Sequence, residues 1–264
     1  MQREINKNVN IRVVSINDFV TAPELSLLPL NSRKLLYLAI SQCKKSDKEF
    51  FEYTISVKEF AEMMGIDESN VYREANNITR RLLGIVMECN LHGDGYDQYT
   101  LFSKCTYRKK EGNIKFKLNT DMTEFLLGLN KNFTQPLLDD FVHMNSPYSM
   151  AIWHLMQREM HSKKPGITQS IEFDLSLEEL RQVTGTEHKL KQIGQFKERV
   201  LDKAIREIKD NCAVVVTYVN IKKGRKIVGF HFTARQEYYI NPAAVSPETM
   251  QRVADHKRRM EERQ

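Results

Sequence analysis

Two stretches of the chain share one pattern of apolar and polar positions. Ile55-Ser-Val-Lys-Glu-Phe-Ala-Glu-Met-Met-Gly65 aligns without a gap with Leu175-Ser-Leu-Glu-Glu-Leu-Arg-Gln-Val-Thr-Gly185, at an offset of 120 residues. In each stretch a serine is followed three residues later by a glutamate (Glu59, Glu179), which predicts a capping box at the start of a short helix. A glycine then ends each helix, where left-handed backbone is needed. The match indicates an internal repeat.

Each copy continues into a longer helix and a hairpin. Amphipathic helical patterns follow the glycines over residues 69–87 and 189–209. Val, Tyr and Phe then alternate around a Gly-containing turn, which predicts a β-hairpin. The paired strands are Gln98–Arg108 with Asn113–Leu118, and Ala213–Ile221 with Lys226–Thr233. A further amphipathic helix precedes each copy, at Ser32–Lys44 and Ser146–His161.

These patterns predict an α+β protein with two tandem winged-helix domains, since a helix-turn-helix followed by a hairpin is a winged helix. The polar stretch Gly128–Pro136 marks the boundary. The first domain then spans residues 10–130, the second 131–240, and a polar tail 241–264. The residues predicted to form the core of the second helices are Leu82, Leu83 and Val86 in the first domain, and Phe196, Val200, Leu201, Ala204 and Ile208 in the second.

The distribution of charge along the chain indicates the kind of partner the protein binds. The chain has 40 Lys and Arg against 34 Asp and Glu, a net charge of +6. Residues 188–235 hold twelve basic and four acidic residues, a balance of +8, so the remainder carries −2. A basic field concentrated in one stretch favours a polyanionic partner, most often nucleic acid. The alternative is a solvated lysine-rich face.

Other patterns exclude several classes of protein. The four cysteines include no CxxC pair, which is typical of a reducing compartment. No apolar run reaches the roughly 18 residues that span a bilayer, and the polar N-terminus has no signal core, so we expect a cytoplasmic protein. No GxxxxGK[ST] loop and no pair of histidines separated by one apolar residue is present. We therefore expect no enzyme, no cofactor and no metal site.

Several blocks resemble plasmid replication initiators of the RepA/RepE type. Phe196-Lys-Glu-Arg-Val-Leu-Asp-Lys-Ala-Ile-Arg-Glu-Ile208 and Lys222-Lys-Gly-Arg-Lys-Ile-Val-Gly-Phe-His-Phe232 resemble the C-terminal half of that family. Ser146-Pro-Tyr-Ser-Met-Ala-Ile-Trp-His-Leu resembles the start of its second domain, and Leu30-Asn-Ser-Arg-Lys-Leu-Leu resembles its first helix. The resemblance covers about residues 10–235.

The resemblance implies a function. Members bind direct repeats (iterons) in a plasmid origin as monomers, one winged helix per half of each repeat. They promote opening of the adjacent AT-rich DNA and recruit the host replicative helicase and host initiator. Many dimerise through the first domain, and the dimer represses the initiator's own promoter. The alternatives from the residues are a winged-helix transcriptional repressor and, less favoured, a rolling-circle nicking enzyme.

The second helix of a helix-turn-helix meets base edges with its N-terminal residues, and a wing meets backbone. In the second domain the candidates for base edges are Lys189, Lys191, Gln192, Gln195 and Arg199, those for phosphate are Lys197, Lys203 and Arg206, and those in the wing are Lys222, Lys223, Arg225 and Lys226. In the first domain the candidates are Ser69, Asn70, Arg73, Asn76, Asn77, Arg80 and Arg81 on the helix, and Arg108, Lys109 and Lys110 in the wing. For charged helix residues such as Arg206, intrahelical pairing is the alternative.

Overall fold

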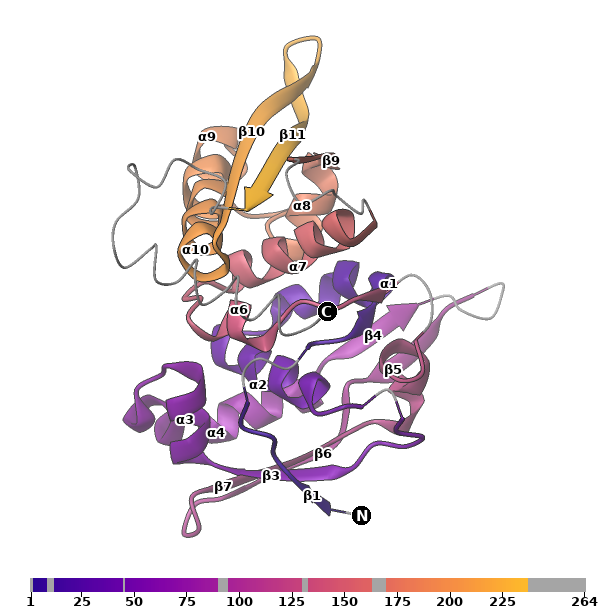
Figure 1. Ribbon diagram of the computed structural model, residues 1–264, viewed down its shortest axis with the longest axis vertical. Helices are drawn as coiled ribbons and strands as arrows, with labels where there is room; N and C mark the ends of the chain where they lie inside the picture. Colours follow the sequence, from indigo (N-terminus) through magenta and orange to yellow (C-terminus); the bar gives the residue numbers. More distant parts are fainter. Residues whose placement is uncertain are drawn as a thin grey trace. The chain divides into compact units, whose positions relative to one another are not determined.

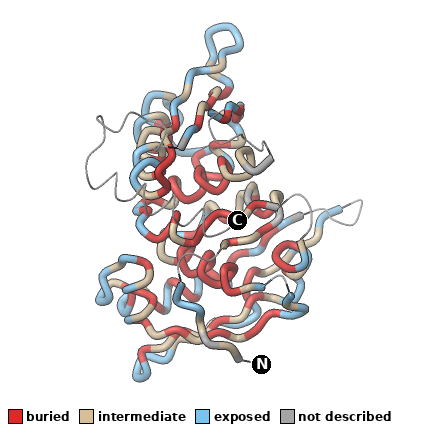
Figure 2. The backbone as a smooth tube through the Cα atoms, viewed as in Figure 1, coloured by how far each residue is buried: buried red, intermediate tan, exposed pale blue. Residues whose placement is uncertain are grey.

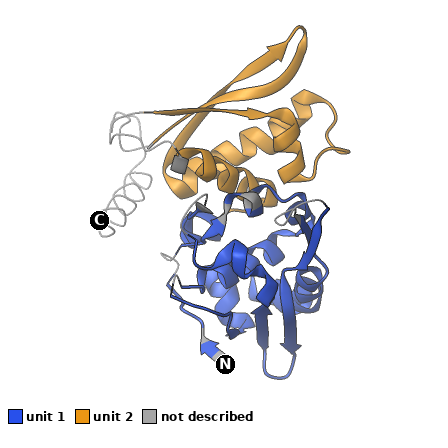
Figure 3. Ribbon diagram, turned by 90° about the vertical axis from the view of Figure 1, so that its right-hand side faces the viewer, with its two compact units in different colours: residues 1–143 blue, residues 144–264 orange. Residues whose placement is uncertain are grey.

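The computed structural model describes residues 2–8, 12–44, 46–89, 95–129, 133–162 and 170–236 (Figure 1). The chain forms two compact units, residues 1–143 and 144–264 (Figure 3). The polar tail lies outside the described residues, as does the pair Tyr238-Tyr239, which the sequence predicts to pack or stack at the end of the second domain. Among the described residues, no helix is long and apolar enough to cross a membrane.

Unit 1 packs helices against a four-stranded sheet. Its helices are α1 (Asn17–Thr21), η1 (Pro23–Leu27), α2 (Leu30–Ser41), α3 (Val57–Met64), α4 (Glu68–Leu83), η2 (Thr120–Met122), α5 (Thr123–Leu126) and α6 (Leu138–Val142). Its strands are β1 (Gln2–Glu4), β2 (Ser15–Ile16), β3 (Glu52–Ser56), β4 (Val86–Cys89), β5 (Asp97–Thr100), β6 (Phe102–Arg108), β7 (Asn113–Leu118) and β8 (Phe133–Thr134). The main sheet has the order β1-β3-β7-β6, with β1 parallel to β3 and the other pairs antiparallel.

The helix-turn-helix of unit 1 is α3 and α4. The predicted capping box is present: the backbone N–H of Glu59 donates to Ser56 Oγ, and the Glu59 carboxylate accepts from the backbone N–H of Ser56, each at 3.1 Å. Gly65 ends α3 with a φ of +58°, in the left-handed region that glycine adopts without strain. The turn contains only residues 65–67 before α4 begins.

Two predicted core residues of unit 1 are exposed. Leu82 is fully buried as expected, but Leu83 is 38% and Val86 43% exposed. The predicted helix overran its true end, because α4 stops at Leu83 and the chain turns at Gly84 into β4. A helical phase therefore no longer applies at Val86. The strand predicted over residues 98–108 is likewise two strands, since β5 pairs with β4 while β6 pairs with β7.

The unit boundary falls after His143, whereas the sequence predicts one between residues 130 and 131. The residues in between pack into unit 1. β8 pairs with β2, and the Phe141 ring on α6 lies 4.5 Å from the Tyr37 ring on α2. Lys34 Nζ also donates to the carbonyl oxygen of Val142, at 2.5 Å. The polar stretch predicted as the boundary therefore comes before the last elements of unit 1.

Unit 2 is a more regular winged helix. Its elements are α7 (Pro147–Ser162), β9 (Ile171–Ser176), α8 (Leu177–Thr184), α9 (Ile193–Phe196), the π-helical turn η3 (Lys197–Leu201), α10 (Asp202–Cys212), β10 (Val214–Lys223) and β11 (Lys226–Gln236). The antiparallel sheet has the order β10-β11-β9. The five predicted core residues of the second helix, from Phe196 to Ile208, are all 0% exposed, which confirms the helical periodicity.

The second capping box forms only in part. Ser176 Oγ accepts from the backbone N–H of Glu179 at 3.0 Å, as predicted. The Glu179 carboxylate instead accepts from the Arg158 guanidinium on α7, at 2.8 Å. Gly185 ends α8 with a φ of +61°. The glutamate at this position therefore ties α8 to the preceding helix.

The sequence prediction lacks β3 in the sheet of unit 1 and β9 in the sheet of unit 2. β3 and β9 run directly into the capped helices, and their residues alternate between buried and less buried positions. Their sequences, Glu52-Tyr-Thr-Ile-Ser56 and Glu172-Phe-Asp-Leu-Ser176, also match at the repeat's offset of 120 residues. The alternation, with a period of two, is the signal that finds them.

Candidate nucleic-acid interface

The turn between α8 and α9 differs from the prediction. Lys189, Lys191 and Gln192, expected at the start of a helix, lie ahead of it in an eight-residue loop, residues 185–192. Gln192 is the N-cap residue of α9, and the helical run continues through η3 and α10 to Cys212. We call residues 185–192 the α8–α9 loop. The side chains of all three polar candidates are exposed.

Arg181, on α8, organises this loop. Its guanidinium donates to four main-chain carbonyl oxygens: Thr186 at 2.8 Å, Lys189 at 3.1 Å, Leu190 at 3.0 Å and Lys191 at 3.3 Å. The same guanidinium lies 4.7 Å from the centre of the Phe196 ring. Burial lowers the pKa of Arg181, yet an arginine remains charged at physiological pH. Sequence patterns gave no reason to single out this residue.

The helical run of unit 2 presents a polar face. Its exposed residues include Gln195, Arg199 and Arg206, and Lys203 is half-buried. The π-helical turn η3 contributes Arg199 to this face. Single π-helical turns inside α-helices frequently occur at functional sites. Phe196 and Val200 point the opposite way, into the core.

A polar cluster joins this helical run to the first wing strand, β10. The Tyr218 hydroxyl donates to Asp202 Oδ1 at 2.8 Å, and burial, reinforced by Asp202, raises the pKa of Tyr218 above its usual value. Lys197 Nζ lies 5.2 Å from the Tyr218 ring centre and donates to Asn220 Oδ1 at 3.4 Å. Lys197, predicted as a phosphate contact, therefore contacts the first wing strand.

The wing of unit 2 projects beyond the rest of its sheet (Figure 1). β9 pairs with β11 only from Ile171 to Ser176, opposite Ala234 to Gly229, so the hairpin tip has two strands. Gly224 takes a φ of +62° in the tip and has open space around it. The wing candidates form the exposed tip (Figure 2): Lys222, Lys223, Arg225 and Lys226. Four cations on one short turn make a strong positive potential.

Several candidates on α4 of unit 1 already have local partners. Asp67 accepts from the Ser69 hydroxyl and, at 3.2 Å, from the backbone N–H of Asn70. The side-chain oxygen of Asn70 accepts from Arg73 at 2.5 Å, and Asn77 donates to Glu74 at 3.3 Å. Four predicted contacts (Ser69, Asn70, Arg73 and Asn77) thus support the helix itself. The side chains of Asn76, Arg80 and Arg81 are exposed on the same helix.

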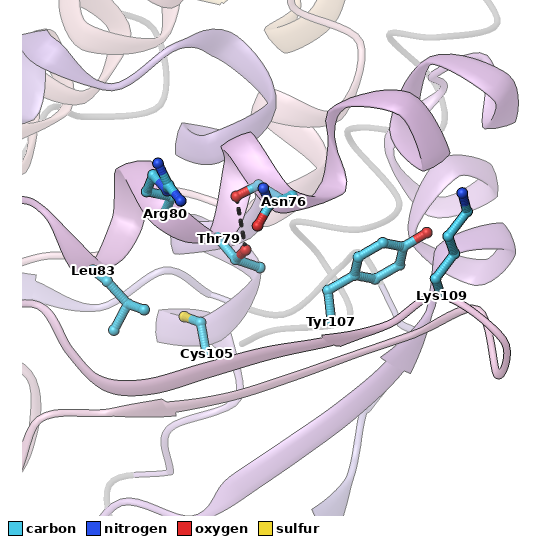
Figure 4. Close-up of a pocket in the computed structure, with 7 residues that line it drawn as sticks. All are labelled: Asn76, Thr79, Arg80, Leu83, Cys105, Tyr107 and Lys109. Carbon is cyan, nitrogen blue, oxygen red and sulfur yellow. Dashed lines mark hydrogen bonds between the residues drawn. The ribbon is translucent and has the colours of Figure 1, made fainter.

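A groove of about 430 Å³ separates α4 from the wing of unit 1 (Figure 4). Its lining comes from α4 on one side and from β6 and its turn on the other: Asn76, Thr79, Arg80, Leu83, Cys105, Tyr107 and Lys109. Leu83 is exposed because it faces this groove and not the core. Burial raises the pKa of Cys105 to about 12, so its thiol stays protonated. Arg80 and Lys109 are the two cations among these lining residues, and none of the lining residues is acidic.

The wing of unit 1 is short and held at its turn. Arg108, Lys109 and Lys110 are exposed there. The carbonyl oxygen of Gly112 accepts from the backbone N–H of Val57 at 2.7 Å, which ties the turn to the start of α3. Gly112 has a φ of +63°, and a Cβ at that position would lie 2.8 Å from the Tyr72 hydroxyl oxygen. The two wings thus differ at their turns: that of unit 1 bonds to the start of α3, whereas that of unit 2 lies beyond the part of the sheet that β9 covers.

Two successive helix-turn-helix motifs, each with a basic wing, define the tandem winged-helix class. Two family models match the chain: "Initiator Replication protein, WH1" over residues 12–157 and "Initiator Rep protein, WH2" over residues 176–234. The chain belongs to this Rep3 family of replication initiators, as the resemblance predicted. The family consists of DNA-binding initiators and not of enzymes.

Individual relatives agree with this assignment. The PI protein of Escherichia coli is 26% identical over 239 residues, a match covering 79% of this chain and 78% of that protein. A solved structure, the Pi initiator protein in complex with iteron DNA, has a similar fold, with a TM-score of 0.71 and 21% identity. That match covers 86% of this chain and 98% of the other.

Proposed function

We propose that this chain is a plasmid replication initiator that binds the direct repeats of an origin as a monomer. The observation that carries the proposal is in unit 2. There the α8–α9 loop and the polar face of the helical run expose Lys189, Gln192 and Arg199, and the wing of the same unit exposes four cations at its tip. Family membership and the iteron complex of the similar Pi protein support the same conclusion.

Unit 2 is proposed as the main reader of sequence. Lysine and arginine pair with guanine, and glutamine with adenine, in the major groove. The exposed residues of the loop and the start of the helical run have these side chains, whereas the tip of the wing has only cations and glycine. The wing tip therefore adds affinity through phosphates with little sequence information.

Unit 1 is proposed to contribute mainly backbone contacts. If α4 enters the major groove and the wing lies over the minor groove, the sugar-phosphate strand between the two grooves runs between them. The groove beside α4 occupies that position, and Arg80 and Lys109 in its lining suit a phosphate. This assignment accounts for the internally paired Ser69, Asn70 and Arg73, which support the helix.

The test is selection of bound duplexes from a random library, followed by sequencing. A monomer with two recognition helices should select a motif of about two helical turns. The triple variant Lys189→Ala, Lys191→Ala, Arg199→Ala should lose the preference in one half of that motif. Arg80→Ala with Lys109→Ala should keep the motif, weaken binding to all sequences and lower the salt slope by about two.

Lys48→Ala removes an exposed lysine outside the recognition helices and wings, and serves as the matched control. A symmetric inverted repeat as the selected motif would contradict monomeric reading of direct repeats and favour the transcriptional repressor. A library without any enriched motif would contradict sequence-specific binding altogether.

The proposal extends to the events that follow binding. We infer that the bound chain promotes opening of AT-rich DNA and recruits the host replicative helicase and host initiator, and that a dimer formed through unit 1 represses its own promoter. The resemblance to the RepA/RepE type supports these functions. Retention of purified host helicase by the chain on origin DNA, but not on DNA without direct repeats, is the expected result.

A further inference from the structure

The two helix-turn-helix motifs differ in one place despite their shared frame. In unit 1 the turn between the helices contains three residues, 65–67, whereas the α8–α9 loop of unit 2 contains eight, 185–192. Both turns begin with a left-handed glycine. The longer loop therefore inserts its additional residues just before the recognition helix, where base contacts are made.

Such a loop needs something to fix its shape. It has no strand partner and includes Leu190, a non-glycine residue with a φ of +49°. This conformation is strained for a leucine and persists only where the surroundings impose it. Within the loop the backbone provides a bond from the Lys189 N–H to the Thr186 carbonyl, at 3.2 Å. The hydroxyls of Thr184 and Thr186, 2.9 Å apart, fix the first part of the loop.

Arg181 supplies the remaining constraint. A guanidinium has five N–H donors in a fixed plane, and here it bonds to four carbonyl oxygens that converge on it from Thr186 and from residues 189–191. The Phe196 ring, fully buried at the start of the helical run, lies against the guanidinium. The carbonyls point inward to the arginine, and the side chains of Lys189 and Lys191 are exposed.

We propose that Arg181 is a positioning residue for sequence recognition: it holds the α8–α9 loop in the shape that presents Lys189, Lys191 and Gln192 to the bases, without touching DNA itself. The proposal rests on the proposed function for its DNA readout. It assigns specificity to a residue on the first helix of the motif, whose own side chain is directed at main-chain atoms.

The first test uses the full chain and does not involve DNA. Arg181→Gln and Arg181→Lys are compared with the wild type by amide hydrogen exchange. A lysine is a point donor and cannot bond to four carbonyls spread around a planar fork. We expect the amide of Lys189, which bonds to the Thr186 carbonyl inside the loop, to exchange at least tenfold faster in both variants, while those of α10 and β11 keep their protection. Unchanged exchange in the loop would overturn the proposal.

The second test is a double-mutant cycle on DNA. Arg181→Lys should weaken binding to the selected duplex about tenfold or more and leave binding to a scrambled duplex nearly unchanged. Combined with Lys189→Ala and Lys191→Ala, the substitution should cost much less than it does alone, because the side chains it positions are already gone. Combined with Lys223→Ala in the wing tip, its cost should be additive, which provides the control.

Equal losses on selected and scrambled duplexes, or additive costs in both cycles, would overturn a positioning role and indicate a direct contact or a general loss of fold. If the wild-type chain itself does not discriminate between duplexes, the proposed function fails. The hydrogen-exchange result then still decides whether Arg181 orders the loop.

Discussion

Lys34 is buried in unit 1, 2% exposed, although lysines are rarely interior. Its ammonium donates to the carbonyl oxygens of Met64, at the end of α3, and Val142, on α6, at 2.9 and 2.5 Å. One side chain on α2 therefore holds two other helices by their C-terminal carbonyls. These carbonyls have no further residue in their helix to bond to, so the lysine acts as a shared cap.

Lys34→Met should lower the free energy of unfolding by about 3 kcal/mol, because two buried carbonyl oxygens lose a charged donor. Urea denaturation of the full chain measures the change. Lys58→Met removes an exposed lysine that lies 3.9 Å from Glu62, and should cost less than about 0.5 kcal/mol. Similar costs for the two variants would contradict the capping role.

Cys105 gives a second prediction at this scale. With its pKa raised to about 12, its thiol is almost entirely protonated at pH 8, and the thiolate is the reactive form. Alkylation of Cys105 by iodoacetamide at pH 8 should be at least tenfold slower in the native chain than in denaturant. Mass spectrometry of the modified peptide measures the rate. Rapid native labelling would contradict the burial of this thiol.

Individual residues show where reading the sequence succeeds and where it fails. Phe196 and Val200 were predictable as core because a long helix repeats its buried face every 3.6 residues. The exposure of Leu83 was not predictable, because Leu83 is the last residue of α4 and the chain turns at Gly84, so the helical repeat does not continue past it. Lys189 was wrongly predicted at the start of a helix. No sequence pattern near it indicates that the Arg181 side chain bonds to the carbonyl oxygens of the α8–α9 loop.

At the scale of elements, the two capped helices use the same serine differently. In α3 the carboxylate of Glu59 returns to its own cap and also accepts from Lys7, whereas in α8 the corresponding Glu179 bonds to Arg158. The hydrogen bond from Lys7 lowers the pKa of Glu59 the most, and the hydrogen bond from the Ser56 backbone N–H has the next largest effect. An identical sequence signature therefore closes one helix on itself and links the other to its neighbour.

The lowered pKa of Glu59 predicts a pH dependence. A carboxylate with a lower pKa in the folded state stabilises the fold above its ordinary pKa, and this contribution disappears as the pH falls through the folded value. Glu59→Gln should therefore destabilise the chain at pH 7 by a few tenths of a kcal/mol, screened by solvent, and by less at about pH 3. Thermal unfolding at both pH values measures the difference. A cost that is the same at both would contradict the assignment.

The wing tip of unit 2 gives another prediction for an element. Replacing Lys222, Lys223, Arg225 and Lys226 by serine should weaken binding to every duplex and make log Kd less dependent on log salt by up to about four in slope. The melting temperature should not change, because all four side chains are exposed on a two-stranded tip. Fluorescence anisotropy over a salt series measures the slope. An altered sequence motif would contradict a backbone role.

For the whole molecule, the residues between the two predicted domains decide where the chain can be truncated to give a folded fragment. Residues 131–143 follow the predicted boundary, yet β8 pairs with β2 and α6 buries Leu138, Phe141 and Val142 in unit 1. Hydrophobic periodicity found both winged helices. It did not find this segment, because two short elements of two and five residues are too brief to show a period.

Truncation tests this division. A fragment of residues 1–143 should unfold cooperatively, whereas a fragment of residues 1–130 should be largely unfolded or aggregate, since it loses the partner of β2 and exposes Tyr37 and Lys34. Circular dichroism during thermal unfolding compares the two. Equal stability of both fragments would show that residues 131–143 add nothing to unit 1.

The anchoring of the α8–α9 loop bears on how related replicons diverge. Because Arg181 bonds to main-chain oxygens, most side chains from residue 187 to 192 can change without loss of the anchor, and none of them belongs to the buried core. If these side chains read DNA as proposed, sequence recognition is separated from the stability of the fold. Substitutions at six positions could then change the target sequence of an initiator while its architecture stays the same.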